Sequence, residues 1–210
     1  SDVDRSDIFV TTKLWNNAQG YEPALTAIDK SLTKLGLDYV DLYLVHWPKP
    51  EHTEETWRAM EEIQRSGKTR AIGVSNFLPG HLDQLAETAT VLPSINQIEF
   101  HPHLQSPELV TYCEDHNIVL EAWSPLKAGR IVDEPELHAI ADAHGVTVPQ
   151  VVLRWMLQRG IVVIPKSVTP SRIAQNAELY GFELNPDEVA AINNMDRTDR
   201  VGPDPANFNF

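Results

Sequence analysis

Polar side chains stand directly after several short apolar runs of this sequence, a pattern that could gather them around one site. Lys13 follows a run that ends at Thr12, and His46 closes a run that begins at Asp41. A lysine held near apolar walls offers a functional ammonium, and an imidazole can donate a hydrogen bond to a substrate oxygen. The structural alternatives are a rim charge for Lys13 and a hydrogen-bonded core group for His46.

The most specific signal is a cluster of positive groups between the last apolar run, which ends at Ile164, and a helix that opens near Pro170. A helix start presents free backbone N–H groups and a partial positive charge, and both attract anions. Lys166, Ser167 and Arg172 add two cations and a hydroxyl at the same place. The pattern predicts a phosphate-binding site, with an ion-pair network on the rim as the alternative.

Two other features are less specific. Trp123 ends another apolar run, and its indole either offers a flat face to a ligand or packs in the core. His101 and His103 flank a proline and could chelate a metal. Because the spacing places no third ligand, we expect no metal site.

These side chains must be positioned by the elements between them. Six runs rich in β-branched residues predict strands over 8–12, 41–46, 70–74, 95–100, 118–123 and 161–164. Segments of helical period predict helices over 25–35, 54–65, 79–88, 106–115, 134–143 and 149–158, and two more after Thr169-Pro170 and Asn185-Pro186. Strands that are apolar on both faces and alternate with helices predict a parallel sheet covered by helices.

Two α/β architectures compete for this pattern, an open doubly wound sheet and a closed barrel. The first strand is not followed by the G-x-G-x-x-G run of a dinucleotide-binding open sheet, so we favour a (β/α)8 TIM barrel. Such barrels have eight strands and about 250 residues. With six strands in 210 residues, we expect one domain over 1–210 that lacks the first two βα units. We expect its tail, 200–210, with Phe208 and Phe210, either to cover the barrel mouth or to fray.

Composition excludes several classes of protein. The chain has 17 basic and 30 acidic residues, a net charge of −13, which repels nucleic acid. No run approaches the roughly 18 apolar residues of a membrane span. Cys113 is the single cysteine of the sequence, which excludes a disulfide scaffold and fits a reducing cytoplasm.

Three long motifs in order resemble the aldo-keto reductases: LDYVDLYLVHWP at 37–48, GKTRAIGVSNF at 67–77, and IPKSVT at 164–169 with Arg172, Gln175 and Asn176. The resemblance extends over essentially the whole chain. TKLWN at 12–16 and WSPL at 123–126 are most similar to the prokaryotic branch that contains 2,5-diketo-D-gluconate reductases. The resemblance implies NADPH-dependent reduction of a small aldehyde, ketone or dicarbonyl.

The resemblance also implies roles for particular residues. Lys13 and His46 match two of the family's four catalytic groups, where lysine lowers the pKa of a tyrosine and histidine orients the carbonyl. Trp15, His46 and Trp47 match the substrate-binding positions. The residues that match cofactor contacts are Ser75, Asn76, Gln97, Trp123, Ser124, Leu126, Lys166, Ser167, Val168, Thr169, Arg172, Gln175 and Asn176. Within that set, Trp123 matches the residue that stacks on the nicotinamide, and Lys166 and Arg172 match the clamp on the 2′-phosphate, which favours NADP over NAD.

The chain departs from the family pattern at the other two catalytic groups. No residue before Lys13 matches the family's tyrosine or its supporting aspartate. We expect a truncated or partly recorded reductase, with another chain covering the open sheet edges as the alternative. A complete barrel predicts a monomer, and truly open edges predict self-association. The rival function is a catalytically inactive module that binds NADPH.

Overall fold

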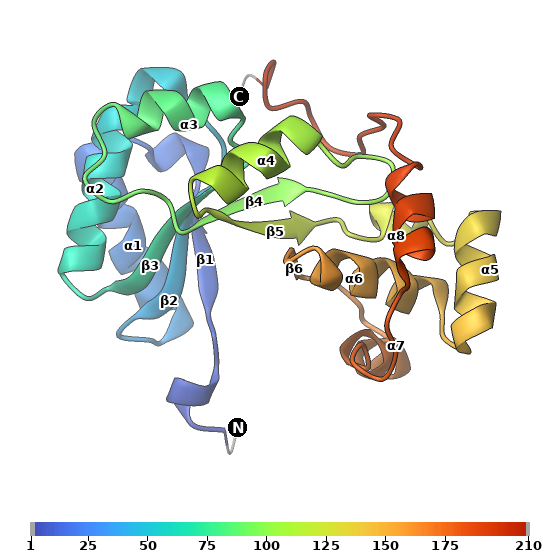
Figure 1. Cartoon of the computed structure of the whole chain (residues 1–210). Coiled ribbons are helices and arrows are strands. Elements are labelled where there is room, and N and C mark those ends of the chain that lie inside the picture. Colours follow the sequence, from blue (N-terminus) through green and yellow to red (C-terminus); the bar gives the residue numbers. More distant parts are fainter. Residues whose placement is uncertain (1–2, 209–210) are drawn as a thin grey trace. The chain divides into compact units, whose positions relative to one another are not determined.

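The structure is a computed structural model that describes residues 3–208 as an alternation of strands and helices (Figure 1). Its strands are β1 (Thr11–Leu14), β2 (Val40–Val45), β3 (Thr69–Ser75), β4 (Ile95–Glu99), β5 (Val119–Trp123) and β6 (Val162–Val163). Its helices are α1 (Tyr21–Leu35), α2 (Thr53–Arg65), α3 (Pro79–Ala86), α4 (Pro107–Asp115), α5 (Pro135–His144), α6 (Val148–Gln158), α7 (Pro170–Ala177) and α8 (Pro186–Asn193). Short 3-10 turns are η1 (Arg5–Asp7), η2 (Asn16–Ala18), η3 (Pro50–His52) and η4 (Lys127–Gly129).

The six strands stand in the sheet in their sequence order, with β1 and β6 at the two ends of that order. The pairs β1–β2, β2–β3 and β5–β6 are parallel. The predicted α/β fold with six strands is therefore confirmed. Within residues 3–208 the sheet is not the closed eight-stranded barrel of the parent fold.

The chain divides into two compact units. Unit 1 comprises residues up to 96 with 115–118 and 205 onward, and unit 2 comprises 97–114 and 119–204. The strand β4 begins in unit 1 and ends in unit 2.

Unit 1 is built around β2, whose six residues are all buried. Leu42 and Leu44 face one side of the strand and Tyr43 and Val45 the other, because side chains alternate along a strand. Helix α1 buries Ala24, Ile28 and Leu32 at helical spacing. It ends at Gly36 in the left-handed conformation (φ 66°), where glycine carries no steric penalty. The predicted helix stop is confirmed.

The first strand begins later than its sequence predicts. Pairing with β2 starts at Thr11 opposite Leu42, so Ile8 and Phe9 precede the strand and Phe9 is 68% exposed. Lys13 consequently lies inside β1 rather than after it, which corrects the predicted strand 8–12. Apolar residue type alone misplaced the strand because the pairing partner, not hydrophobicity, fixes where it starts.

Unit 2 packs the last strands against α6, which buries a run of large side chains. The indole of Trp155 stacks on Phe100 after β4, with ring centroids 5.4 Å apart. Thr147 caps the start of α6 by accepting the N–H of Gln150. At the predicted caps of the next two helices, Asn185 accepts the N–H of Glu188, whereas the Thr169 side chain makes no cap bond. Helix α7 buries none of its residues and lies at the surface.

A test of this packing uses Gly73 of β3, where the neighbouring residues Ile95 and Leu44 leave no room for a side chain. A Cβ there would lie 2.6 Å from the carbonyl oxygen of Ile95 and 2.8 Å from Cδ2 of Leu44. We expect Gly73→Ala to lower the free energy of unfolding by about 1–3 kcal/mol, measured by urea titration, because backbone must shift to admit the methyl group. Gly80→Ala in α3 is the matched control, since nothing lies within 4 Å of its added Cβ. Equal unfolding midpoints for the two variants would contradict the prediction.

Candidate active site and anion-binding cavity

Three residues predicted to hold substrate lie together where β1 and β2 end in unit 1. His46 directly follows β2, and its backbone N–H donates to the backbone carbonyl of Leu14 at 3.2 Å. Its ring centroid lies 4.8 Å from that of Trp15 and 6.3 Å from that of Trp47. Trp15 is 55% exposed and Trp47 is buried, so the imidazole has one solvent-exposed and one buried aromatic neighbour.

The environment of His46 keeps the imidazole neutral. Burial, and then the positive charge of Lys13, lower the pKa of His46 to about 4. Nδ1 is buried, and among the described residues no group bonds to it. Because an unpaired buried donor is costly, we assign the single proton of the neutral ring to Nε2. The ring can therefore donate one hydrogen bond through Nε2.

Asn76 connects the end of β3 to this histidine. Its backbone is left-handed (φ 64°), a conformation that asparagine tolerates better than most residues. Its Nδ2 donates to the carbonyl of His46 and to Oγ of Ser75, both at 3.0 Å. Both predicted cofactor residues of this strand end are thus buried beside the histidine backbone.

The C-terminal tail also reaches an aromatic side chain of unit 1. The ring centroid of Phe208 lies 4.3 Å from that of Trp47. Phe210, the other phenylalanine of the predicted cover, lies outside the described residues. That the tail covers the barrel mouth remains a prediction.

Unit 2 holds the other predicted cofactor residues. Gln97 in β4 is buried and donates to the Glu121 carboxylate, and Trp123 is half-buried at the end of β5. The same unit contains a cavity of about 820 Å³. It is lined by Ser124, Pro125, Leu126, Ala128, Gly129, Val132, Thr147, Pro149, Ile164, Lys166, Ser167, Arg172, Gln175 and Asn176.

Seven of the thirteen predicted cofactor residues share this cavity: Ser124, Leu126, Lys166, Ser167, Arg172, Gln175 and Asn176. Val168 and Thr169 do not line it, and the N–H of Thr169 instead donates to Oγ of Ser167 at 3.1 Å. Ser75, Asn76, Gln97 and Trp123 are also absent from its lining. The phosphate-clamp part of the prediction is thus gathered in one place, whereas the nicotinamide part is not seen in this cavity.

The two cations of the cavity have no protein partner in the described part of the chain. Within residues 3–208, neither Lys166 nor Arg172 forms an ion pair or a side-chain hydrogen bond, so the alternative of a rim ion-pair network is not observed. At the start of α7, the backbone N–H groups of Ser171 and Arg172 have no acceptor within the helix. Two cations, one of them in the first turn of a helix, therefore line the cavity with bonding capacity to spare, which suits an anion.

Part of the cavity wall comes from residues 124–129, which we call the wall loop; the sequence analysis named Ser124 and Leu126 of this loop but not Pro125, Ala128 and Gly129. Ser124, Lys127 and Ala128 have left-handed backbones, with φ of 53°, 49° and 53°. Such strain in residues with a Cβ persists where surrounding contacts fix the backbone, and it often marks a binding element. The available signal was position alone, since loops that follow strands of parallel sheets carry function.

His101 and His103 serve protein contacts in this structure. Nε2 of His101 lies 3.0 Å from Oε1 of Glu99, and His103 contacts Lys127 and Arg197. Among residues 3–208 no group of three or more potential ligands could hold a metal ion. The described helices are also too short or too polar to cross a membrane.

Known proteins are similar to this chain along most of its length. The sequence profile described as the Aldo/keto reductase family matches residues 1–197. The chain belongs to this family.

Individual relatives are similar over nearly all of this chain. It is 48% identical to the glyoxal reductase of Bacillus subtilis (strain 168), covering 100% of this chain and 76% of that protein. It is 46% identical to the methylglyoxal reductase DkgA of Escherichia coli (strain K12), covering 98% of this chain and 76% of that one. A solved mutant of Gox0644 in complex with NADPH is 46% identical, with a TM-score of 0.95, covering 99% of this chain and 78% of that one.

The electrostatics of the candidate active site can be tested through Lys13. Its positive charge disfavours protonation of His46, so Lys13→Met should raise the pKa of His46 above about 4. The pKa should stay below the ordinary value of 6.5, because burial, the larger cause, remains. The measurement is an NMR titration of the imidazole. Lys30→Met, an exposed lysine of α1, is the control, and an equal pKa of His46 in both variants would contradict the assignment.

Proposed function

We propose that this chain binds NADPH in the unit 2 cavity and reduces a small aldehyde, ketone or dicarbonyl compound to the alcohol. The observation that carries the proposal is the pair of unpartnered cations, Lys166 and Arg172, on the wall of that cavity. Relatives that act on glyoxal and methylglyoxal support the small dicarbonyl as substrate.

The lining of the cavity suits the phosphate-bearing end of NADPH. Lys166 and Arg172 supply charge for a 2′-phosphate, and Ser167 supplies a hydroxyl. The amides of Gln175 and Asn176 can hydrogen-bond to a base, and Leu126 gives it an apolar surface. A volume of about 820 Å³ lies within the usual range for ligand pockets. NAD lacks the 2′-phosphate, so this donor set favours NADP.

Unit 1 supplies the groups that would act on the carbonyl. The neutral His46 would donate its Nε2 hydrogen to the carbonyl oxygen and stabilise negative charge as it develops there. Trp15 and Trp47 would exclude water from the reacting group, which strengthens that hydrogen bond. When bound, NADPH would supply the hydride for the carbonyl carbon and leave as NADP, and solvent would supply the proton that converts the alkoxide to the alcohol. Burial, and then the charge of Lys13, keep His46 unprotonated, so the histidine orients the substrate and does not serve as the acid at neutral pH.

The second candidate function is a module that binds NADPH without turnover. It requires only the cations, hydroxyl and amides that are gathered in the unit 2 cavity. The family resemblance gives a tyrosine the role of proton donor to the alkoxide.

The phosphate clamp is tested by Lys166→Ala combined with Arg172→Ala. Losing two charge-assisted contacts should weaken NADPH binding by at least about tenfold and leave NADH binding nearly unchanged. The measurement is quenching of tryptophan fluorescence by each dinucleotide. The control variant, Lys34→Ala with Arg65→Ala, removes the same charge from exposed positions of α1 and α2. An unchanged NADPH affinity in the first variant would show that the clamp is misassigned.

The two functions are separated by turnover. If the chain is a reductase, NADPH absorbance should fall when glyoxal or methylglyoxal is added, and His46→Ala should lower kcat by about 10²–10³-fold through loss of one donor to the oxyanion. If NADPH quenches tryptophan fluorescence but neither dicarbonyl is reduced, the binding module is the correct function. Trp57→Phe, in the buried core of α2, is a control for a lost aromatic or ring donor away from the histidine.

A further inference from the structure

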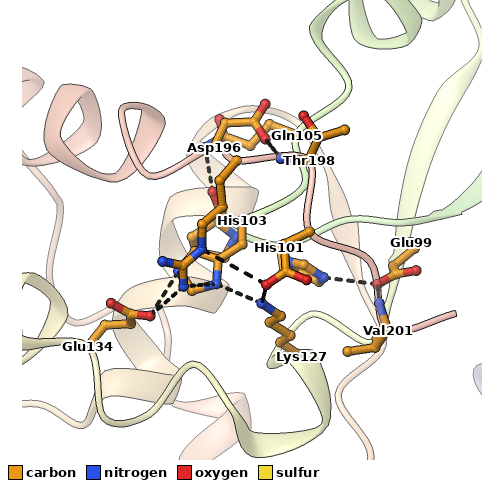
Figure 2. Close-up of polar contacts among 12 residues, drawn as sticks. Glu99, His101, His103, Gln105, Lys127, Glu134, Asp196, Thr198 and Val201 are labelled. Atoms are coloured by element: carbon orange, nitrogen blue, oxygen red, sulfur yellow. Dashed lines mark hydrogen bonds and ion pairs between the residues drawn. The ribbon is translucent and has the colours of Figure 1, made fainter.

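Residues 197–202, which include the first residues of the tail, are fastened to the rest of unit 2 at three points, and we call them the strap (Figure 2). At its start, the Arg197 guanidinium lies 2.8 Å from Oε1 of Glu134 and 2.9 Å from Nδ1 of His103. The backbone N–H groups of Arg197 and Asp199 both donate to the carbonyl of His103. The strap is therefore held by side chains and backbone together.

The middle of the strap holds a buried lysine of the wall loop. Lys127 is 5% exposed, and its ammonium donates to the carboxylate of Asp199 and lies 3.0 Å from Nδ1 of His103. Burial and the charges of Arg197 and Lys127 lower the pKa of His103 to about 4, so its neutral ring can accept a hydrogen bond. Figure 2 shows Lys127 pointing toward His103. These contacts fix the left-handed Lys127, which precedes Ala128 and Gly129 on the cavity wall.

The end of the strap is held by Glu99, which is 3% exposed. Its Oε1 accepts the N–H of Val201 at 2.7 Å, and its Oε2 accepts the N–H of Gly202 at 3.0 Å. Burial alone would raise the pKa of Glu99, but the bonds from His101, Val201 and Gly202 lower it below its ordinary value. An ionised carboxylate thus anchors two successive backbone amides, and Figure 2 shows the contact with Val201.

At the end held by Glu99, the strap backbone lies close to the indole of Trp123. A Cβ added to Gly202 would lie 2.4 Å from Cη2 and 3.3 Å from Cζ2 of the indole, and 3.2 Å from Oε2 of Glu99. The backbone of Gly202 is outside the left-handed region, so space rather than conformation requires glycine here. The strap backbone therefore limits how closely the indole can approach Gly202.

We propose that the strap positions Trp123 and the wall loop for the cofactor, with Gly202, Glu99 and Asp199 as positioning residues. Gly202 and Glu99 set the indole against which the nicotinamide would stack, and Asp199 sets the wall that faces the rest of the dinucleotide. The proposal rests on the proposed function, because it gives Trp123 and the cavity their ligand.

The test compares two ligands, NADPH and 2′-phospho-ADP-ribose, which lacks the nicotinamide, by isothermal titration calorimetry. Gly202→Ala should weaken NADPH binding roughly tenfold, the effect of overpacking by one methyl group, and leave the shorter ligand nearly unchanged. Gly181→Ala is the control, since nothing lies within 4 Å of its added Cβ and its backbone is not left-handed. Asp199→Asn should weaken both ligands, because both would contact the wall loop.

A double variant distinguishes a local clash with the indole from general misfolding of Gly202→Ala. In a Trp123→Phe background, the shorter ring leaves room for the methyl group, so Gly202→Ala should add no further loss of NADPH affinity and should restore any lost thermal stability. If Gly202→Ala affects neither ligand or both equally, or its penalty persists beside Phe, the role in setting the indole is overturned. If Asp199→Asn changes neither affinity, the role in setting the wall is overturned. If the unaltered chain binds neither ligand, the proposed function fails, and the strap proposal with it.

Discussion

A pair of cations without carboxylate partners among the described residues is the feature on which the proposed binding of NADPH in unit 2 depends. The chain has a net charge of −13, so most of its surface repels anions. Other cations, such as Arg65 and Lys68, pair with a nearby carboxylate. Lys166 and Arg172 do not do so within the described chain, and the fold places both on one cavity wall. A phosphate held there must be bound by short-range contacts, since the long-range field of the protein opposes its approach.

Burial and neighbouring cations act on two histidines in the same direction but with different results. Both His46 and His103 have a pKa of about 4, and both rings are therefore neutral near pH 7. His103 is surrounded by the donors Lys127 and Arg197 and serves as an acceptor inside a structural network. His46 has no hydrogen-bond partner at its buried Nδ1 in the described residues, which leaves Nε2 as its donor. The hydrogen-bond partners of the two rings, and not their pKa values, distinguish the structural His103 from the candidate catalytic His46.

Much of the fold was predictable because its signals are local. The spacing of Ile28 and Leu32 and the stop at Gly36 gave α1, and the cap at Asn185 gave the start of α8. Six apolar runs gave six strands. The presence of Lys166, Ser167 and Arg172 on one cavity was also predictable, because they lie within seven residues of one another on a strand-to-helix junction. Contacts between neighbours in sequence need little tertiary information.

The sequence by itself thus determined the alternation of elements, the charge cluster and the family resemblance. The tertiary structure decided where β1 begins, and so that Lys13 lies within the strand rather than after it. It also decided that Glu99 anchors Val201 and Gly202, more than a hundred residues away, and that Lys127 is buried with a left-handed backbone. These facts depend on which distant groups share a desolvated space, where an unpaired charge or a misplaced methyl group is costly. Residue type and spacing do not contain that information, because it arises only when the chain has folded.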